Sequence, residues 1–311
     1  MKKLIILGSG AAGLTAAIYA GRTGLEPLVI AGDTPGGLLT KTGEVENFPG
    51  FPEGINGFEL MARMRKQAER FGASFLNTSA EKVTVNPDQT KTIRLINGEE
   101  LQCSALIIAT GSEPRWLGIE AEKKFIGRGV SACATCDGAF YRNMPVAVVG
   151  GGDTAMEEAL SLTKFASEVH VIHRRDTLRA TKIMAERALA NPKITFHWNK
   201  EVVDMTGGDF LTELTLKDTV TGELSTLRCD GCFVALGHIP GTAIFRDLLS
   251  LSDGGCVNLQ CNTSLTGIEG VFAAGDCADC FYRQAIMAAG MGCRAAMDAA
   301  HWLEKQEEHK S

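Results

Sequence analysis

The sequence has no surplus of positive charge and no long block of like charge. Its 31 lysines and arginines are outnumbered by 37 aspartates and glutamates, which gives a net charge of −6 at pH 7. Such a chain has no basic field for a phosphate backbone, and it has no charged arm or tail. We therefore expect no nucleic-acid partner.

Long apolar runs are also missing. Residues 4–21 follow two lysines and resemble a secretory signal, but Gly8, Gly10 and Gly13 interrupt the stretch after four apolar residues. A signal peptide or a membrane span needs a longer unbroken run. We therefore expect a cytoplasmic protein without a membrane segment. Its ten cysteines should stay reduced there, so that any disulfide is catalytic.

Metal-ligand patterns are scarce, since the six histidines show none. Cys229 and Cys232, with Cys277 and Cys280, could together supply four thiolates to zinc. Cys232 leads into an apolar strand, however, where a small buried side chain is the simpler interpretation. We expect no metal site.

The chain does have length and apolar content. Its 311 residues are 45% apolar and 22% charged. A chain of this size can bury a large core and is long enough for two domains. The composition predicts a soluble globular protein.

A pair of cysteines separated by two residues is the most informative motif. Cys133 and Cys136 lie just upstream of an apolar strand at residues 146–149 and a glycine turn at residues 150–153. A CxxC pair in an intracellular chain is usually a reversible dithiol or half of a metal site. The neighbouring nucleotide turn favours the dithiol, because it supplies an electron source. The motif indicates a redox enzyme.

The same strand, turn and helix pattern occurs twice, at residues 4–30 and 146–172. In each copy an apolar strand runs into a glycine-rich turn, at residues 8–13 and 150–155, before helical spacing begins. One such turn is weak evidence, since glycine also lets a helix pack on a strand. Two copies in the right frame predict two dinucleotide sites.

The second copy carries basic residues where the adenosine ribose should lie. His173, Arg174 and Arg175 end its second strand, and Arg179 lies one helical turn further on. An acid at this place bonds the ribose hydroxyls, whereas arginine accommodates a 2′-phosphate. The pattern favours NADPH over NADH, with a solvated basic helix start as the alternative. In the first copy the acid is missing at the strand tip, and Asp33 lies two positions late.

The rest of the first site comes from far along the chain. Residues 271–276 form a predicted buried strand that ends in Gly275 and Asp276, an acid suited to a hydroxyl of FAD. The helix that follows has small residues at 288–292, which permit close approach of backbone to flavin. Because Asp276 completes a site begun at Gly8, the chain must leave the first domain and return.

With these motifs the chain resembles the bacterial-type, low-molecular-weight thioredoxin reductases. The resemblance runs nearly end to end and includes EVENFPG at residues 44–50, ATG at 109–111, CATCDG at 133–138, GGGD at 150–153, HRR at 173–175, GD at 275–276 and RQA at 283–285. Two departures are Leu38, where the family commonly has glutamine, and Gly241, where it often has asparagine.

The resemblance implies an α/β fold with two Rossmann-like nucleotide-binding domains of the three-layer ββα type. The NADPH domain, residues 116–245, carries the redox-active CxxC and is inserted into the FAD domain, residues 1–115 and 246–311. The two domains are expected to swivel about their double connection, and the family is homodimeric.

The implied activity is that of an NADPH-dependent flavoprotein that reduces the disulfide of thioredoxin or of a similar small dithiol protein. By resemblance, Cys136 faces the flavin, Cys133 attacks the partner's disulfide and Asp137 shuttles the proton. Asp137 could instead be only a turn residue. A flavin dithiol oxidase fed by another donor and a non-catalytic redox sensor are the alternative functions.

The implied cofactor contacts form two sets. The contacts to FAD are Gly8, Gly10, Ala11, Ala12, Gly13, Ala31, Gly32, Asp33, Thr34, Pro35, Gly36, Gly37, Leu38, Asn47, Ala109, Thr110, Gly111, Gly275, Asp276, Cys277, Ala278, Asp279, Cys280, Phe281, Tyr282, Arg283, Gln284 and Ala285. The contacts to NADPH are Gly152, Asp153, Thr154, His173, Arg174, Arg175 and Arg179.

The remaining cysteines carry weaker expectations. Cys277 and Cys280 closely follow Asp276, the acid predicted to bind FAD. They could form an auxiliary redox pair near the flavin or could be plain loop residues. The cysteines without partner spacing are interpreted as packing or surface thiols; they are Cys103, Cys256, Cys261 and Cys293.

Overall fold

The chain folds into two units, and it passes from one to the other through two short strands that pair with each other. The computed structural model describes residues 1–41 and 43–308. The outer unit is Met1–Glu113 with Ile239–Ser311, and the inserted unit is Pro114–His238. The crossings lie in β9 (Ser112–Pro114) and β18 (His238–Pro240), which pair with each other. The sequence predicts the two crossings at residues 115–116 and 245–246, just after β9 and several residues beyond β18.

A seven-stranded sheet forms the centre of the outer unit. Its order is β5-β2-β1-β8-β7-β6, and β19 also pairs with β8. The strands are β1 (Lys2–Leu7), β2 (Leu28–Ile30), β5 (Ser74–Leu76), β6 (Ala80–Val85), β7 (Lys91–Leu95), β8 (Glu100–Ile108) and β19 (Val271–Ala273). Pairing is parallel from β5 to β8 and between β8 and β19, and antiparallel from β8 to β6.

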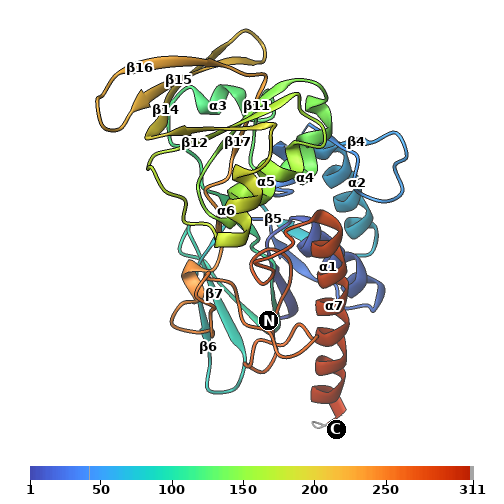
Figure 1. The fold of residues 1–311 in the computed structure, drawn as a ribbon. Helices are drawn as coiled ribbons and strands as arrows, with labels where there is room; N and C mark the ends of the chain where they lie inside the picture. Colours follow the sequence, from blue (N-terminus) through green and yellow to red (C-terminus); the bar gives the residue numbers. More distant parts are fainter. Residues whose placement is uncertain (42, 309–311) are drawn as a thin grey trace. The chain divides into compact units, whose positions relative to one another are not determined.

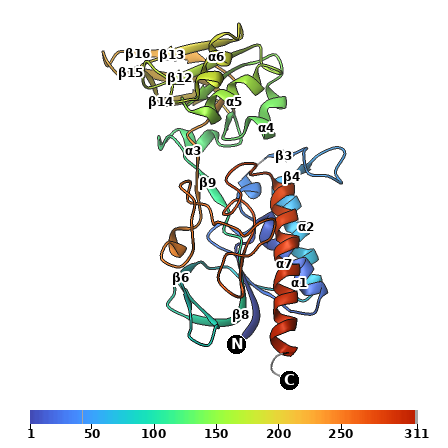
Figure 2. The same cartoon turned by 60° about the horizontal axis from the view of Figure 1, so that its bottom comes forward.

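The other elements of the outer unit are three helices and several short pieces. The helices are α1 (Ala11–Arg22), α2 (Gly57–Arg70) and α7 (Ala285–Glu308), and the short pieces are the strands β3 (Glu44–Val45) and β4 (Ile55–Asn56) and the 3₁₀ turns η1 (Leu38–Lys41) and η3 (Ala243–Phe245). α1 and α7 lie side by side in both ribbon views (Figures 1 and 2).

Strand β1 is buried on both faces because its side chains alternate between two cores. Leu4 and Ile6 pack in the cluster that contains α1 and α7, whereas Ile5 and Leu7 pack in the cluster with β6, β7 and Phe245. A strand covered on both sides is a continuous apolar run in the sequence. This explains why residues 4–7 show no polar alternation.

The inserted unit contains a five-stranded parallel sheet and a three-stranded antiparallel sheet. Their orders are β10-β17-β11-β12-β13 and β14-β15-β16. The strands are β10 (Val130–Ser131), β11 (Pro145–Val149), β12 (Glu168–His173), β13 (Ile194–Trp198), β14 (Lys200–Gly207), β15 (Leu211–Asp218), β16 (Leu224–Arg228) and β17 (Gly231–Val234). The helical elements are α3 (Glu122–Phe125), α4 (Ala134–Asp137), η2 (Gly138–Tyr141), α5 (Asp153–Leu162) and α6 (Lys182–Leu189).

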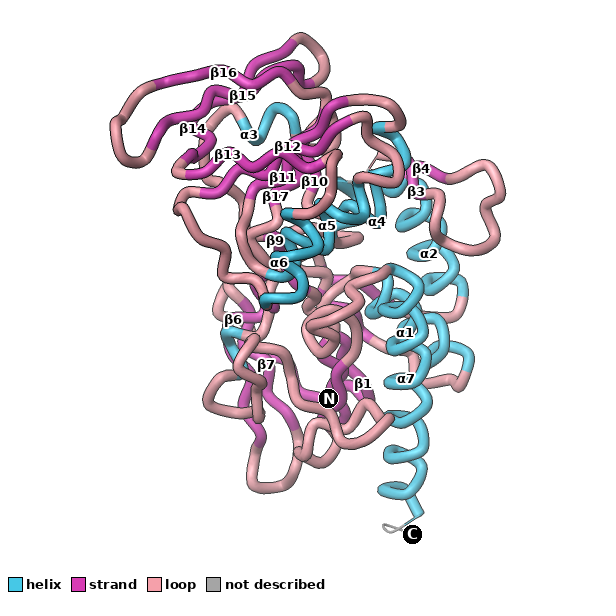
Figure 3. The backbone as a smooth tube through the Cα atoms, in the orientation of Figure 1, coloured by secondary structure: helices cyan, strands magenta, loops and turns pink. Residues whose placement is uncertain are grey.

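The inserted unit has three layers. Val146 and Val148 of β11 pack against α5 and α6, and Ala147 and Val149 face the opposite way, toward β14, β15 and β16. Figure 3 shows the antiparallel strands as a layer separate from α5 and α6, whereas the short α3 lies beside these strands. The predicted α/β class with two Rossmann-like units is confirmed in the fold.

Small residues let α7 pack tightly against α1. A Cβ built on Gly292 would lie 2.1 Å from the carbonyl oxygen of Ala12, whereas one built on Gly290, two positions earlier in α7, would meet no atom within 4 Å. The two glycines therefore lie in the same helix, but only Gly292 is in close contact with α1.

We expect Gly292→Ala to destabilise the outer unit by about 1–3 kcal/mol, because the added methyl group forces the two helices apart. Gly290→Ala, the matched control, should be neutral or stabilise by up to about 1 kcal/mol, since alanine favours an open helical position. Denaturant unfolding of both variants measures this. Equal stabilities would contradict the close packing.

Candidate active site

The N-terminus of α1 is open for an anion. The helix follows the N-cap Gly10, no side chain caps it, and its first turn holds no acid. A Cβ built on Gly10 would meet nothing within 4 Å. Unpaired backbone N–H groups and the helix dipole favour a phosphate here, and the absent side chain leaves room for it. The turn therefore fits the pyrophosphate of a dinucleotide.

Ser9 fastens the next loop to this turn. Its hydroxyl donates to the carbonyl of Ala31 at 2.8 Å and accepts from the N–H of Gly36 at 2.9 Å. Both partners belong to the loop at residues 31–38, which thus folds back over the glycine turn. The carboxylate of Asp33 accepts a hydrogen bond from Ser79. Sequence reasoning did not identify Ser9, which resembles any serine of a glycine turn.

The pairing of β19 with β8 brings Asp276 to the first site. Phe272 pairs with Ile107, and Asp276 then lies 3.4 Å from the hydroxyl of Ser112, just beyond β8. Burial raises the pKa of Asp276 to about 6; nearby Asp279 adds to this, whereas Arg283 and Ser112 oppose it. A carboxylate in this place can accept a hydrogen bond from a hydroxyl of a bound cofactor.

The segment after Asp276 is a closed turn. The N–H groups of Ala278 and Asp279 donate to the carbonyl of Gly275, and the Asp279 carboxylate accepts from the N–H groups of Phe281 and Tyr282 at 2.9 Å. Separately, the amide of Asn47 donates to Gln284 at 3.3 Å. The structure thus brings together predicted flavin contacts from both ends of the chain.

The structure excludes the auxiliary pair that the spacing left open and corrects the interpretation of Cys256. Cys280 forms a disulfide with Cys256, whereas Cys277 is a buried free thiol 3.3 Å from the carbonyl of Ala274. Cys277 and Cys280 are therefore not an auxiliary pair, and Cys256 is not a packing thiol. The physical reason is that the turn after Asp276 directs the two side chains to different neighbours. The expectation that any disulfide is the catalytic one also fails.

The second CxxC-spaced pair is buried. Burial raises the pKa of Cys229 to about 12 and that of Cys232 well above its ordinary value, so neither thiol ionises near neutral pH. Within residues 1–41 and 43–308, no group of three or more histidine, cysteine or acidic side chains could hold a metal ion.

The second glycine turn opens α5. Gly152 is its N-cap and no side chain caps the helix, while the carboxylate of Asp153 accepts hydrogen bonds from the N–H and hydroxyl of Thr181 at 2.7 and 2.9 Å. The N–H of Arg179 donates to the carbonyl of Gly151 at 2.7 Å. The loop that carries the predicted phosphate contacts is therefore held against the turn.

His173 and the arginines play different parts in this loop. The ring of His173 is buried against Gly151, where a Cβ would lie 2.2 Å from the ring, and its Nε2 is 2.9 Å from the carbonyl oxygen of Thr177. Burial lowers the pKa of His173 and the nearby arginines add to this, whereas the hydrogen bond with Thr177 opposes it, so the neutral ring is favoured. The arginines Arg174, Arg175 and Arg179 are exposed.

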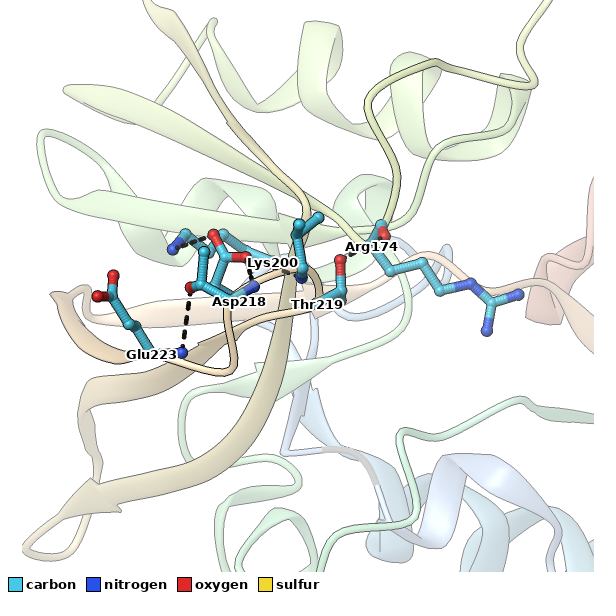
Figure 4. Close-up of polar contacts among 7 residues, drawn as sticks. Arg174, Lys200, Asp218, Thr219 and Glu223 are labelled. Atoms are coloured by element: carbon cyan, nitrogen blue, oxygen red, sulfur yellow. Dashed lines mark hydrogen bonds and ion pairs between the residues drawn. The ribbon is translucent and has the colours of Figure 1, made fainter.

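Figure 4 shows how Arg174 is held. Its carbonyl accepts from the hydroxyl of Thr219 at 3.2 Å, and its guanidinium extends away from the ion pair of Lys200 and Asp218, whose charged atoms are 2.9 Å apart. The backbone of Arg174 is therefore fixed by the β15–β16 hairpin, and its charge is presented to solvent.

Cys133 and Cys136 form a disulfide with Cα atoms 5.3 Å apart. Cys133 is the N-cap of α4, and its sulfur accepts from the N–H of Cys136 at 3.2 Å. The N–H of Cys133 donates in turn to the hydroxyl of Ser131 at 3.1 Å. A hydrogen bond to sulfur favours the thiolate, so the geometry suits Cys133 as the nucleophile after reduction.

Two partly buried carboxyl groups, those of Asp137 and Glu158, lie near this disulfide. Burial raises the pKa of Asp137, against an opposing hydrogen bond with Ser131. Burial also raises the pKa of Glu158 to about 7, opposed by a bond from the N–H of Ala134 and assisted by Asp137. Within the described chain the Oε2 atom of Glu158 is buried without a hydrogen-bond partner. Sequence reasoning missed Glu158, because helical spacing does not show which element packs against α5.

A pH-dependent stability follows from Glu158. Its pKa rises from 4.5 to about 7 on folding, so the folded protein holds this proton more tightly than the unfolded chain does. The stabilisation is full below pH 4.5 and is lost as the pH rises through 7. We expect the wild type to lose about 3 kcal/mol relative to Glu158→Gln across this range, at 1.36 kcal/mol per pKa unit. Denaturant unfolding of both proteins at several pH values measures the difference, and parallel pH profiles would contradict it.

No helix in the described part of the chain combines the length and the apolar character that a membrane crossing requires.

Comparison with known proteins identifies the family. The family model described as pyridine nucleotide-disulphide oxidoreductase matches residues 2–292. The chain is 51% identical over 304 residues to a thioredoxin reductase of Mycolicibacterium smegmatis, covering 98% of this chain and 97% of that protein. It is 49% identical to a bifunctional thioredoxin reductase/thioredoxin of Mycobacterium leprae, covering 99% of this chain and 67% of that protein.

A solved structure gives the same result. The thioredoxin reductase of Streptococcus pyogenes is 38% identical, with a TM-score of 0.92 over 97% of this chain and 98% of that one. The resemblance inferred from the motifs is thereby confirmed: this chain belongs to the pyridine nucleotide-disulphide oxidoreductases and, among them, to the thioredoxin reductases.

Proposed function

We propose that the chain reduces the disulfide of thioredoxin, or of a similar small dithiol protein, with NADPH as donor and FAD as the resident cofactor. The observation that carries the proposal is the half-buried disulfide Cys133–Cys136, which lies in the same unit as a glycine turn flanked by exposed arginines. A dithiol and a place for its electron donor are thus both present. Within the family, this combination supports a reductase.

The residues of the outer unit fit a flavin dinucleotide. The open N-terminus of α1 would hold the pyrophosphate, and Asp276 would orient the chain of hydroxyls beside Ser112. When bound, the flavin supplies two-electron exchange between a nicotinamide and a disulfide. In the inserted unit, the start of α5 and the arginines 174, 175 and 179 would hold the phosphates of NADPH.

Cys133 and Cys136 carry the exchange with the partner, and Asp137 assists the proton transfer. Once reduced, the Cys133 thiolate attacks one sulfur of the partner's disulfide, and the other sulfur leaves as a thiolate that takes up a proton. Cys136 then attacks the sulfur of Cys133, which releases the partner's second thiol and closes the Cys133–Cys136 disulfide. Asp137 would hold the proton, since burial keeps its pKa above the usual range.

The setting of the reaction is also part of the proposal. We place the protein in the cytoplasm as a homodimer, with thioredoxin as the partner and with neither nucleic acid nor membrane involved. The net charge of −6 supports the first exclusion. A relative that carries reductase and thioredoxin in one chain supports the choice of partner.

Replacing Cys133 tests the central claim. In Cys133→Ser, NADPH oxidation coupled to thioredoxin should fall by on the order of 10³-fold or more, because the nucleophile is gone. FAD should remain bound, and under anaerobic conditions NADPH should still bleach the flavin absorbance. Stopped-flow absorbance with NADPH measures both properties.

The exposed Cys261→Ser is the matched control and should keep full activity. Undiminished protein-disulfide reduction by Cys133→Ser would refute the assigned role. A flavin that NADPH leaves oxidised would instead favour an oxidase fed by another donor.

The arginines test the choice of cofactor. Arg174→Ala or Arg175→Ala should raise the KM for NADPH by about 10- to 100-fold, the loss expected for one charge-assisted bond to phosphate. The KM for NADH should not change, because NADH lacks the 2′-phosphate. Arg187→Ala, an exposed arginine of α6, is the control. Equal effects on both nucleotides would mean that the arginines do not contact the phosphate.

A further inference from the structure

The outer unit contains a disulfide that the proposed reaction does not use. Cys256 and Cys280 are bonded, with Cα atoms 6.0 Å apart and a separation of 24 positions in sequence. The reaction above uses no cysteine other than Cys133 and Cys136, so this second bond requires its own explanation.

Cys256 is fixed in a tight turn. The N–H of Ser252 donates to the carbonyl of Cys256 and the N–H of Gly255 donates to the carbonyl of Ser252, both at 2.8 Å. The N–H of Cys256 donates to the hydroxyl of Ser252 at 3.1 Å. The side chain is only 3% exposed. Its sulfur is therefore shielded from reagents in solution.

Cys280 is the accessible partner. It is half-buried and lies beside Gly254, which is exposed. A Cβ built on Gly254 would be 3.2 Å from the sulfur of Cys280. Because glycine has no side chain, nothing from this position covers the sulfur on its solvent side.

The disulfide lies against the backbone of Asp276, the acid predicted to bind a hydroxyl of FAD. The sulfur of Cys256 is 3.8 Å from the carbonyl oxygen of Asp276, and the next N–H, that of Val257, donates to the carbonyl of Cys277 at 2.8 Å. A reduced Cys256 could donate its S–H to the same carbonyl of Asp276. Both redox states of Cys256 are therefore accommodated without a new partner.

We propose that Cys256–Cys280 is a reversible thiol–disulfide site that exchanges with low-molecular-weight disulfides and their thiols. In oxidation, the Cys280 thiolate attacks the external disulfide, forms a mixed disulfide and releases one external thiol. Cys256 then attacks the sulfur of Cys280, loses its proton and releases the second external thiol. Two protein thiols are oxidised and one external disulfide is reduced to two thiols.

The bond also sets how firmly the flavin is held, a step that rests on the proposed function. It links the turn at residues 252–256 to the segment that begins at Asp276 and continues through Asp279 to Arg283. Opening the bond removes one restraint on this segment, so that flavin binding must order the segment again. Flavin release should become roughly tenfold faster, the change expected from ordering about one residue.

The first experiment follows the bond itself. The full-length holoprotein with Cys133→Ser is equilibrated in buffers of varied ratio of glutathione to its disulfide, its thiols are alkylated, and its peptides are identified by mass spectrometry. The linked Cys256–Cys280 peptide should rise in one two-electron step as the buffer becomes oxidising. A linked peptide that is absent at every ratio, or unchanged at every ratio, overturns the proposal.

A glycine variant tests the point of attack. Gly254→Ala places a methyl group over the sulfur of Cys280 and should slow reduction of the bond by glutathione several-fold. Gly208→Ala is the control and should leave the rate unchanged, because Gly208 is exposed in the inserted unit and a Cβ there would meet nothing within 4 Å. An unchanged rate in Gly254→Ala overturns Cys280 as the sulfur that reacts first.

The flavin step is measured separately by the rate of flavin release from Cys256→Ser, which opens the bond without changing a predicted flavin contact, and from the control Cys261→Ser. Faster release from Cys256→Ser alone supports the proposal, and equal rates overturn the link to the flavin. If no variant and no parent protein binds flavin, the proposed function fails while the thiol titration still stands on its own.

Discussion

The pairing of β19 with β8 is the contact on which the outer unit depends. It joins two segments that the whole inserted unit separates in sequence, and it places Asp276 beside Ser112 at the end of β8. Without it, β8 would lose its pairing with β19, and Asp276 would no longer be held beside Ser112 at this end of the sheet. The long α7, which follows this strand, packs closely against α1.

Much of this arrangement is encoded locally and could be predicted from the sequence. Residues 4–7 and 146–149 are short apolar runs followed by glycine turns, and runs of this kind predict buried parallel strands wherever they lie in a chain. The α/β class and the two units follow from them, and so does the return of the chain to Asp276. The roles of individual cofactor contacts stay predictions, because they depend on molecules that bind to these turns.

The remaining features depend on tertiary packing, which spacing does not record. Cys277 and Cys280 have the spacing of a redox pair, yet the turn at Gly275 directs one inward and the other toward Cys256. Glu158 belongs to no sequence motif, and its pKa is raised mainly by burial, where α5 packs against α4. Sequence patterns identify groups whose role depends on residues close by in the chain. A carboxyl group buried by another helix, or a disulfide between distant cysteines, can be identified only from the three-dimensional structure.

The insertion of one unit within the other has a consequence for synthesis on the ribosome. Domains generally fold as units while the chain emerges from its N-terminus. The inserted unit ends at His238 and is complete before β19 has been translated, whereas Leu106–Ile108 at the end of β8 pair only with β1 until Val271–Ala273 arrives. The inserted unit can therefore fold before the outer unit. A ribosome that stalls between residues 238 and 271 would leave a folded inserted unit attached to an incomplete sheet of the outer unit.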